Sequence, residues 1–393
     1  MTFKRELFHK LKKDLFKGRS TLLLGPRQTG KTTLIKELCE NFPIRLEYDL
    51  RLPSLKLKLE NDPETIIREV RALKSSSKPL VFIDEIQKVP NVMDVLQYLL
   101  DNKMIVLIAT GSSVIKLRRG TTNWLPCRIK LEYLYPLTWQ EIELIDNSKE
   151  DGLFKEHLLF GGLPGIMAEK NLKNRKEDLL AYTSLYLEEE IRQEALVRRL
   201  PTFSKFLKLA ALESGSSPNL SKMANEVGVS HTSIREYYQI LEDSLIVNRI
   251  DSFGKSRSQI LKKSRFYFFD LGVRNSVAEV SHGKAVLTLQ SGLLFEHNIV
   301  LELIAKNCGH YKLSYWRTKQ GNEVDIILEY KEKVIALEIK NTAKPQHEDF
   351  KGLKAFSEAV DCSKRYLICN IDRPQKYPHG MALPWHQLDL IFK

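Results

Sequence analysis

The stretch LLLGPRQTGKTT, residues 22–33, decides the fold of this chain. Its apolar run leads into GPRQTGKT (25–32), which matches the pattern GxxxxGK[ST] in full, and a helical pattern follows from about Lys31 to Cys39. In such a strand–loop–helix unit the glycines let backbone N–H groups face phosphate oxygens, and the helix N-terminus adds its dipole. The stretch therefore predicts a nucleotide-binding loop that comprises Gly25, Pro26, Arg27, Gln28, Thr29, Gly30, Lys31, Thr32 and Thr33.

A second motif supplies the rest of the predicted nucleotide site. LVFIDE, residues 80–85, is an apolar strand that ends in two carboxylates, where α/β sheets bind their ligands. We expect Lys31 to reach the β- and γ-phosphates of ATP, and Thr32 and Asp84 to hold Mg²⁺. Glu85 would then orient and polarise the attacking water, so the pair of motifs predicts hydrolysis as well as binding.

Strands and helices alternate over the first 136 residues. Strands are predicted at 21–26, 79–85 and 104–112 with helical patterns between them, which indicates a parallel α/β sheet. The last of these strands ends in TGSS (110–113), so Ser112 lies next to the predicted switch point of the sheet. Its hydroxyl is a candidate sensor of the γ-phosphate, although these small residues would also be found in a simple turn.

Composition limits the classes of partner. The 393 residues are enough for two or three domains, and 61 Lys and Arg against 49 Asp and Glu give a net charge of +12. This excess favours polyanions such as nucleic acid, although a lysine-rich soluble surface would look the same. The charged N-terminus has no apolar core of a signal peptide, and no apolar run is long enough for a membrane span. We therefore expect a cytoplasmic protein without a membrane partner.

The central part of the chain is predicted to be helical. Residues 137–215 follow a helical pattern that GGLPG (161–165) interrupts with a tight turn, and residues 216–270 have the spacing of a winged helix-turn-helix. The helix expected to read DNA is poor in cations, so a basic wing that grips phosphates is the better hypothesis. Packing between subunits or domains is the alternative. The candidate DNA-binding residues are Arg235, Lys255, Arg257, Lys262, Lys263 and Arg265.

The C-terminal part carries a second candidate site in GNEVDIILEYKEKVIALEIKN, residues 321–341. Glu338 and Lys340 are two positions apart on a predicted strand and share one face, and Asp325 lies on the preceding strand. With Glu296 from an upstream helix, these carboxylates favour a Mg²⁺ or Mn²⁺ site in which Lys340 stabilises charge. A charged sheet edge is the alternative interpretation.

Several motifs together resemble two known families. The ordered set GPRQTGKTT, LVFIDEIQ, TGSS, YLYPLTWQEI (133–142), GGLP (161–164) and FDLGVRN (269–275) resembles prokaryotic AAA+ P-loop ATPases with a helical segment and a nuclease-like C-terminal domain. The order Glu296, Asp325, Glu338 and Lys340 resembles the PD-(D/E)xK nuclease superfamily, which implies a catalytic role for the last three. The AAA+ resemblance also implies an arginine that acts in trans, for which Arg128 is the first candidate and Arg118 and Arg119 the next; the family's usual Gly-Arg is Cys127–Arg128 here.

The resemblance and the residues lead to one architecture and three functional hypotheses. We expect an AAA+ core at 1–136, a helical lid at 137–215, a winged helix-turn-helix at 216–270 and a restriction-endonuclease-like α/β domain at 271–393. The leading hypothesis is a Mg²⁺-dependent ATPase that forms a hexamer-like homo-oligomeric ring and remodels or translocates double-stranded or branched DNA. One alternative is a nucleotide-gated signalling or defence switch that controls a nuclease, and a weaker one is a DNA clamp that does not cut.

Overall fold

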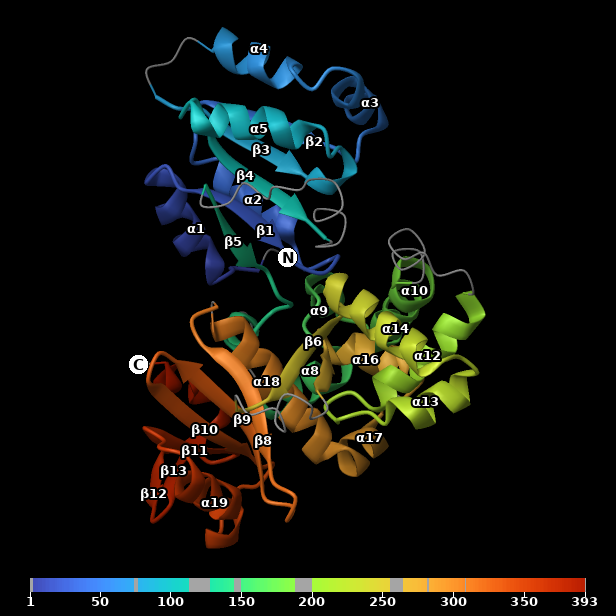
Figure 1. The fold of residues 1–393 in the computed structure, drawn as a ribbon, viewed down its shortest axis with the longest axis vertical. Helices are drawn as coiled ribbons and strands as arrows, with labels where there is room; N and C mark the ends of the chain where they lie inside the picture. Colours follow the sequence, from blue (N-terminus) through green and yellow to red (C-terminus); the bar gives the residue numbers. More distant parts are fainter. Residues whose placement is uncertain are drawn as a thin grey trace. The chain divides into compact units, whose positions relative to one another are not determined.

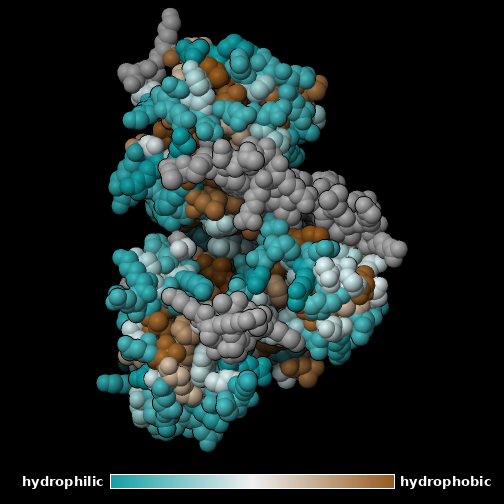
Figure 2. Space-filling view, viewed as in Figure 1, coloured by the Kyte–Doolittle hydropathy of each residue, from teal (hydrophilic) through white to brown (hydrophobic). Residues whose placement is uncertain are grey.

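The computed structural model describes residues 3–73, 77–112, 128–144, 150–187, 200–254, 264–280, 283–307 and 309–392. They form two compact units, one chiefly from residues 1–137 and the other chiefly from residues 138–393 (Figure 1). Hydrophilic residues predominate on the face of both units drawn in Figure 2, as the excess of charged residues requires. Within the described ranges, no helix is both long and apolar enough to cross a bilayer.

The first unit is built on a five-stranded sheet of order β2-β3-β4-β1-β5, in which every pair of neighbours is parallel (Figure 1). This confirms the parallel α/β sheet predicted from the sequence. The three central strands are buried along their whole length, because both faces of a parallel sheet are covered by helices. The strands are β1 (Ser20–Leu24), β2 (Arg45–Asp49), β3 (Leu80–Asp84), β4 (Val106–Gly111) and β5 (Ile129–Tyr133).

Helices cover the two faces of this sheet in two groups. Apolar side chains of α1 (Leu7–Phe16) and α2 (Lys31–Cys39) share one core cluster with alternate residues of β1, β3 and β4. The other residues of these strands pack in a second cluster with α3 (Pro53–Asn61), α4 (Thr65–Ala72) and α5 (Val92–Asp101). The result is a three-layer unit in which β1 delivers the loop 25–30 and β3 delivers Asp84 at the same edge.

The second unit begins with helices and a two-stranded hairpin. Gly228, in the left-handed region with a φ of 80°, makes the turn between α13 (Leu220–Val227) and α14 (His231–Asp243), and β6 (Val247–Ser252) pairs antiparallel with β7 (Arg265–Phe268). The other helices are α7 (Trp139–Glu143), α8 (Glu150–Phe160), α9 (Pro164–Ala168), α10 (Leu172–Ala181), α12 (Leu200–Leu212), α16 (Leu271–Val277) and α17 (Lys284–Leu289).

A mixed sheet completes the second unit, with strand order β12-β13-β11-β10-β9-β8-β6-β7. Strand β6 also pairs in parallel with β8 (Lys312–Arg317), so the hairpin and the C-terminal strands share one sheet. The segments predicted as lid, helix-turn-helix and C-terminal domain therefore pack as one compact unit. Its remaining elements are α18 (Ser291–Asn307), β9 (Glu323–Tyr330), β10 (Lys333–Ile339), α19 (Lys351–Ala359), β11 (Lys364–Cys369), β12 (Gln375–Tyr377) and β13 (Gly380–Pro384).

Candidate nucleotide site and a second carboxylate cluster

The loop between β1 and α2 has the backbone that a phosphate-binding loop requires. Gly30 has a φ of 91° and Gln28 a φ of 62°, so both lie in the left-handed region. Gly25 is needed for space rather than for its φ, because a Cβ there would lie 2.3 Å from the carbonyl oxygen of Leu134. A loop with these conformations, followed directly by the N-terminus of α2, can turn its amide groups toward a phosphate.

The amine of Lys31 closes over this loop. Its Nζ donates to the carbonyl oxygens of Gly25 at 2.7 Å and Pro26 at 2.8 Å, and the side chain is buried. Thr29 Oγ1 also donates to the Pro26 carbonyl, at 2.9 Å. Phosphate oxygens of a bound nucleotide would replace these carbonyls as acceptors for Lys31, which keeps the amine paired in both states.

Thr32 and Asp84 meet across the two motifs. Thr32 Oγ1 donates to Asp84 Oδ2 at 2.9 Å, and Thr110 Oγ1 donates to Asp84 Oδ1. Hydroxyl and carboxylate oxygens are the ligands that Mg²⁺ prefers, and Mg²⁺ in such sites takes its other ligands from phosphate and water. The residues therefore fit a Mg²⁺ ion that arrives with the nucleotide.

Glu85 is held in an unusual backbone conformation. Its φ of 57° is left-handed, which costs a non-glycine residue of the order of 1 kcal/mol. Its N–H donates to Thr110 Oγ1 at 2.9 Å, and its carboxylate accepts from Ser112 Oγ at 3.1 Å and from Gln87 Nε2. Ser112 thus contacts Glu85, and its predicted contact with the γ-phosphate stays a prediction. The sequence analysis missed Gln87, which is buried beside them.

Arg51 is a further group at this site that the sequence analysis missed. Its Nη2 lies 3.1 Å from Asp84 Oδ2, and Asp49 holds the same guanidinium through bonds of 2.8 Å and 2.6 Å. The Arg51 guanidinium lowers the pKa of the Asp49 carboxyl below its usual range through this hydrogen bonding. The strand order explains the meeting, because β2 is the neighbour of β3 and both end at the same edge.

Arg5 and Arg128 are two other arginines of the first unit whose contacts are defined. Arg5 ties the N-terminal segment to the loop through Nη1, which donates to the Thr29 carbonyl at 2.7 Å, and through Nη2, which donates to Tyr135 at 2.6 Å. Arg128 is exposed just before β5, at the edge of the sheet opposite the loop, and pairs with Asp101. The other predicted trans arginines, Arg118 and Arg119, lie outside the described residues.

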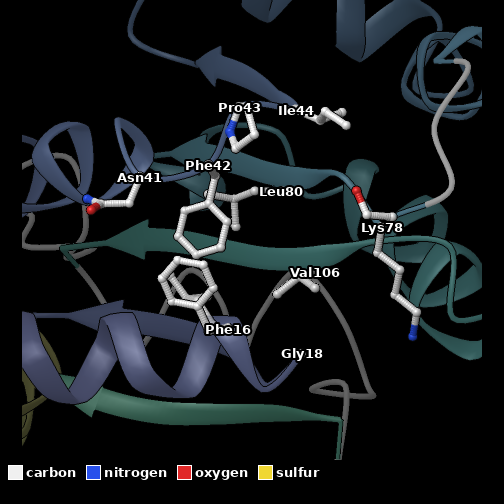
Figure 3. A pocket seen from close by; sticks show the side chains of 11 residues that line it. Phe16, Gly18, Asn41, Phe42, Pro43, Ile44, Lys78, Leu80 and Val106 are labelled. Atoms are coloured by element: carbon white, nitrogen blue, oxygen red, sulfur yellow. The ribbon is translucent and has the colours of Figure 1, made fainter.

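A pocket of about 320 Å³ in the first unit lies away from the nucleotide site (Figure 3). Its walls include Leu80 and Val106, the first residues of β3 and β4, and the stacked rings of Phe16 and Phe42. The residues predicted to bind phosphate are at the carboxyl ends of these strands, so this apolar pocket does not belong to the predicted site.

The second unit gathers the predicted carboxylates. Asp325 Oδ2 accepts from the Ile339 N–H at 2.9 Å, Lys340 Nζ pairs with Glu338 Oε1 at 2.9 Å, and Tyr267 donates to Glu296 Oε1 at 2.9 Å. Burial, reinforced by the nearby Asp325 charge, raises the pKa of Glu296 to about 7 and that of Glu338 to about 8. These residues share one site, as the order of motifs predicted, and the groups around them are mostly buried.

Arg265 faces this cluster and corrects one prediction. Its side chain is 7% exposed, pairs with Glu323, and lies 3.7 Å from Glu296 Oε1 and 3.8 Å from Asp325 Oδ1. Arg265 was predicted to contact DNA phosphates, and that is wrong because the guanidinium is enclosed by carboxylates. A run of basic residues in the sequence indicates positive charge but not the direction of each side chain. The pairing of β6 with β7 directs the side chain of Arg265 toward the carboxylates.

The other candidate DNA-binding residues divide into two groups. Arg235 is exposed on α14, the second helix of the helix-turn-helix, whose first turn is capped by Ser230 Oγ accepting from the Ser233 N–H at 3.0 Å. Lys255, Arg257, Lys262 and Lys263 lie outside the described residues.

The motifs GGLP and FDLG meet through the Asp270 side chain and through a close approach of Gly272 to the Phe160 backbone. The Asp270 carboxylate accepts from the N–H of Gly162 at 2.7 Å and from that of Val273 at 2.9 Å. A Cβ at Gly272 would lie 2.0 Å from the Phe160 carbonyl oxygen, so only glycine fits there. These motifs therefore join α8 to α16, and the glycines at 161 and 272 leave the space that the contact needs.

His157 at the end of α8 completes this junction. Its Nδ1 lies 3.1 Å from the Gly161 carbonyl oxygen and its Nε2 lies 3.0 Å from Asn298 Oδ1. Asn298 Nδ2 has no hydrogen-bond partner among the described residues. Turning the Asn298 amide lets that nitrogen donate to Nε2 while Nδ1–H donates to Gly161, so both ring nitrogens of a neutral imidazole have partners. Burial lowers the pKa of His157 to about 4.

The buried histidine predicts an acid-sensitive second unit. Above pH 6.5 the imidazole is neutral in both states, but between about pH 6.5 and pH 4 only the unfolded chain binds the proton. We expect wild type to lose about 2 kcal/mol more stability than His157→Gln between pH 7 and pH 5. Calorimetric unfolding at both pH values measures this difference. Equal losses in the two proteins would contradict the neutral, buried assignment.

Three segments of the chain match known protein families. Residues 17–143 match the AAA domain family, and residues 151–284 and 291–388 match two domains of unknown function, DUF8612 and DUF4143. The chain therefore contains a P-loop ATPase domain of the AAA type.

Two relatives and one solved structure are similar to the chain over most of its length. An uncharacterized protein of Mycobacterium tuberculosis is 26% identical over 87% of this chain and 75% of its own length. One of Methanocaldococcus jannaschii is 26% identical over 93% and 83%. The Walker-type ATPase of Pyrococcus abyssi has a TM-score of 0.51 at 16% identity and covers 70% of this chain and 96% of its own, a likeness of fold.

Proposed function

We propose that this protein is a Mg²⁺-dependent ATP hydrolase that acts on DNA. The observation that carries the hydrolase part is the contact between Thr32 Oγ1 and Asp84 Oδ2 at 2.9 Å, with Glu85 next in sequence. Lys31 would bind the β- and γ-phosphates, Thr32 and Asp84 would hold the ion, and Glu85 would orient water. Bound Mg²⁺ would supply charge neutralisation on the phosphates.

Charge and fold support DNA as the partner. The net charge is +12, and the second unit presents exposed Arg235 on a helix that follows a tight turn. The order α18-β8-β9-β10-α19-β11, with Asp325, Glu338 and Lys340 side by side, supports a PD-(D/E)xK-like domain. Such a domain and a winged helix-turn-helix both contact duplex backbones, so double-stranded or branched DNA is the proposed ligand.

We also propose that the chain works as a homo-oligomeric ring. Arg128 supports this, because it is exposed at the edge of the sheet opposite its own phosphate loop. An arginine placed there can reach only the nucleotide of a neighbouring subunit, where it would neutralise charge on the γ-phosphate. ATP bound between subunits would then change the angle between domains and so move or remodel the DNA.

Stimulation of hydrolysis by DNA is the test of this function. We expect ATP turnover to rise several-fold with linear duplex or four-way-junction DNA, and DNA affinity to fall steeply with salt. Arg235→Ala should weaken binding across sequences and reduce the salt slope by about 1. Lys173→Ala, a highly exposed cation on α10, is the matched control.

The outcomes separate the hypotheses. Turnover that DNA leaves unchanged, together with nucleotide that dissociates slowly, would contradict the motor and favour the nucleotide-gated switch. DNA binding that is independent of ATP and of Lys31 would favour the clamp. Absence of DNA binding at low salt would reject DNA as the partner.

A further inference from the structure

The carboxylate cluster of the second unit already contains two fixed cations. Lys340 Nζ pairs with Glu338 at 2.9 Å. Arg265 pairs with Glu323 and faces Glu296 at 3.7 Å and Asp325 at 3.8 Å. Each of these carboxylates thus has a basic side chain beside it. A guanidinium stays protonated at any pH that a protein survives, so this neutralisation is permanent.

Arg265 is held in place on every side. It is 7% exposed on the side chain, and its guanidinium lies 4.6 Å from the centre of the Tyr315 ring. Tyr267, two residues further along β7, donates to Glu296 at 2.9 Å and so fixes the orientation of that carboxylate. Strand pairing of β7 with β6 sets the direction of the Arg265 side chain. The guanidinium is therefore a built part of the cluster.

The cluster does not fit a divalent metal. Mg²⁺ or Mn²⁺ needs several oxygens at about 2.0–2.2 Å, whereas Glu296 Oε1 and Asp325 Oδ1 both face Arg265 Nη1. Asp325 Oδ2 accepts from Ile339 N and Glu338 Oε1 is taken by Lys340. In the part of the chain that the structure describes, no group of three or more acidic, His or Cys side chains is arranged to hold a metal. A metal bound by Glu296 and Asp325 would have to compete with the buried guanidinium that faces both carboxylates, and two cations so close together would repel each other.

One atom of the cluster lies beside Gly352. Glu338 Oε2 is buried, has no hydrogen-bond partner among the described residues, and lies 3.2 Å from the place of a Cβ on Gly352. This oxygen faces the first turn of α19. One orphaned oxygen is not a metal site, and a proton on Glu338 would remove the buried negative charge there.

We propose that the guanidinium of Arg265 takes the place of the divalent metal in this cluster, so that the C-terminal unit contacts DNA without cutting it. The DNA part rests on the proposed function, whereas the metal part rests only on the contacts above. The carboxylates that resemble a nuclease motif are present, but basic side chains of the same chain neutralise them.

Counting bound Mn²⁺ on the full chain without nucleotide tests the metal part. Free Mn²⁺ is measured by electron paramagnetic resonance for wild type, Asp325→Asn, Arg265→Gln and Arg265→Lys. We expect wild type and Asp325→Asn to bind the same number of ions. Arg265→Gln should gain one site, at least about 10-fold tighter than any in wild type at this cluster, because a positive charge has left it.

Each variant has a defined outcome. Arg265→Lys keeps the charge and should gain no site, and adding Asp325→Asn to Arg265→Gln should remove the new one. A wild type that binds one ion more than Asp325→Asn overturns the proposal, and this comparison does not depend on the folding of Arg265→Gln. An Arg265→Gln protein that folds but gains no site also overturns it.

Incubation of wild type with closed circular DNA and Mn²⁺ tests the consequence. We expect no nicking at concentrations of protein that shift the DNA in a gel, and nicking that Asp325→Asn abolishes would overturn the proposal. Failure to shift DNA would reject the proposed partner and leave the Mn²⁺ counts to decide on Arg265, so the two failures are distinguishable.

Discussion

Lys31→Ala is expected to lower ATP turnover by about 100- to 1,000-fold without unfolding the first unit. The amine of Lys31 is the only part of its side chain that makes polar contacts in the loop, with the carbonyls of Gly25 and Pro26. It would stabilise the charge that develops between the β- and γ-phosphates, and no water can replace a positive charge in that position. Phosphate release by the purified protein measures the loss.

The helix should tolerate this change, because alanine is the best helix former and the apolar face of α2 is untouched. Leu34, Ile35 and Leu38 remain in their core cluster. Lys36→Ala, an exposed lysine on the same helix, is the matched control and should retain wild-type turnover. Hydrolysis by Lys31→Ala within a few-fold of the control would reject the assignment of the phosphate loop.

The nucleotide site was predictable where its residues are close in sequence. GPRQTGKT forms a contiguous strand–loop–helix unit, and LVFID is buried along its whole length as an apolar run predicts. Arg51 escaped prediction because its contact with Asp84 depends on which strand lies beside β3, and strand order is a property of the whole sheet. Arg5 escaped for the same reason, since Tyr135 approaches it only after β5 joins the sheet beside β1.

The second unit shows the same limit for charged residues. The spacing of Asp325, Glu338 and Lys340 predicted their meeting, because it depends only on the alternation of side chains along two paired strands. The partner of the cluster, Arg265, was interpreted as a surface cation because it follows a run of basic residues. The burial of Arg265 depends on the pairing of two strands and on carboxylates more than 30 residues away in the sequence. A local sequence pattern cannot predict either of these.

GGLP was predicted as a turn, but its role as an anchor for FDLG was not. The two motifs are far apart in the sequence, and no local pattern pairs the Asp270 carboxylate with the N–H of Gly162. Gly161 is in the left-handed region with a φ of 74° and a Cβ there would lie 2.1 Å from Asp270 Oδ1. The glycines at positions 161 and 272 are required by this contact, but glycine is common in turns and does not by itself indicate a partner.

Gly272→Ala is therefore expected to destabilise the second unit by about 3–5 kcal/mol, which lowers its unfolding temperature by about 10 °C. The added methyl would lie 2.0 Å from the Phe160 carbonyl oxygen and 2.3 Å from its carbon, and backbone atoms cannot rotate away as a side chain can. Asn275, which donates to the carbonyls of Leu158 and Leu159, would have to move with the displaced helix. Differential scanning calorimetry of the full chain measures the shift.

Gly292→Ala is the matched control for this prediction. Gly292 is also helical, at the start of α18 in the same unit, and a Cβ there meets nothing within 4 Å. Alanine favours a helix over glycine by up to about 1 kcal/mol, so this variant should be as stable as wild type or slightly more stable. A Gly272→Ala protein that unfolds at the temperature of Gly292→Ala would show that α8 and α16 do not meet through their backbones. In that case the motifs GGLP and FDLG would need a role other than joining α8 to α16.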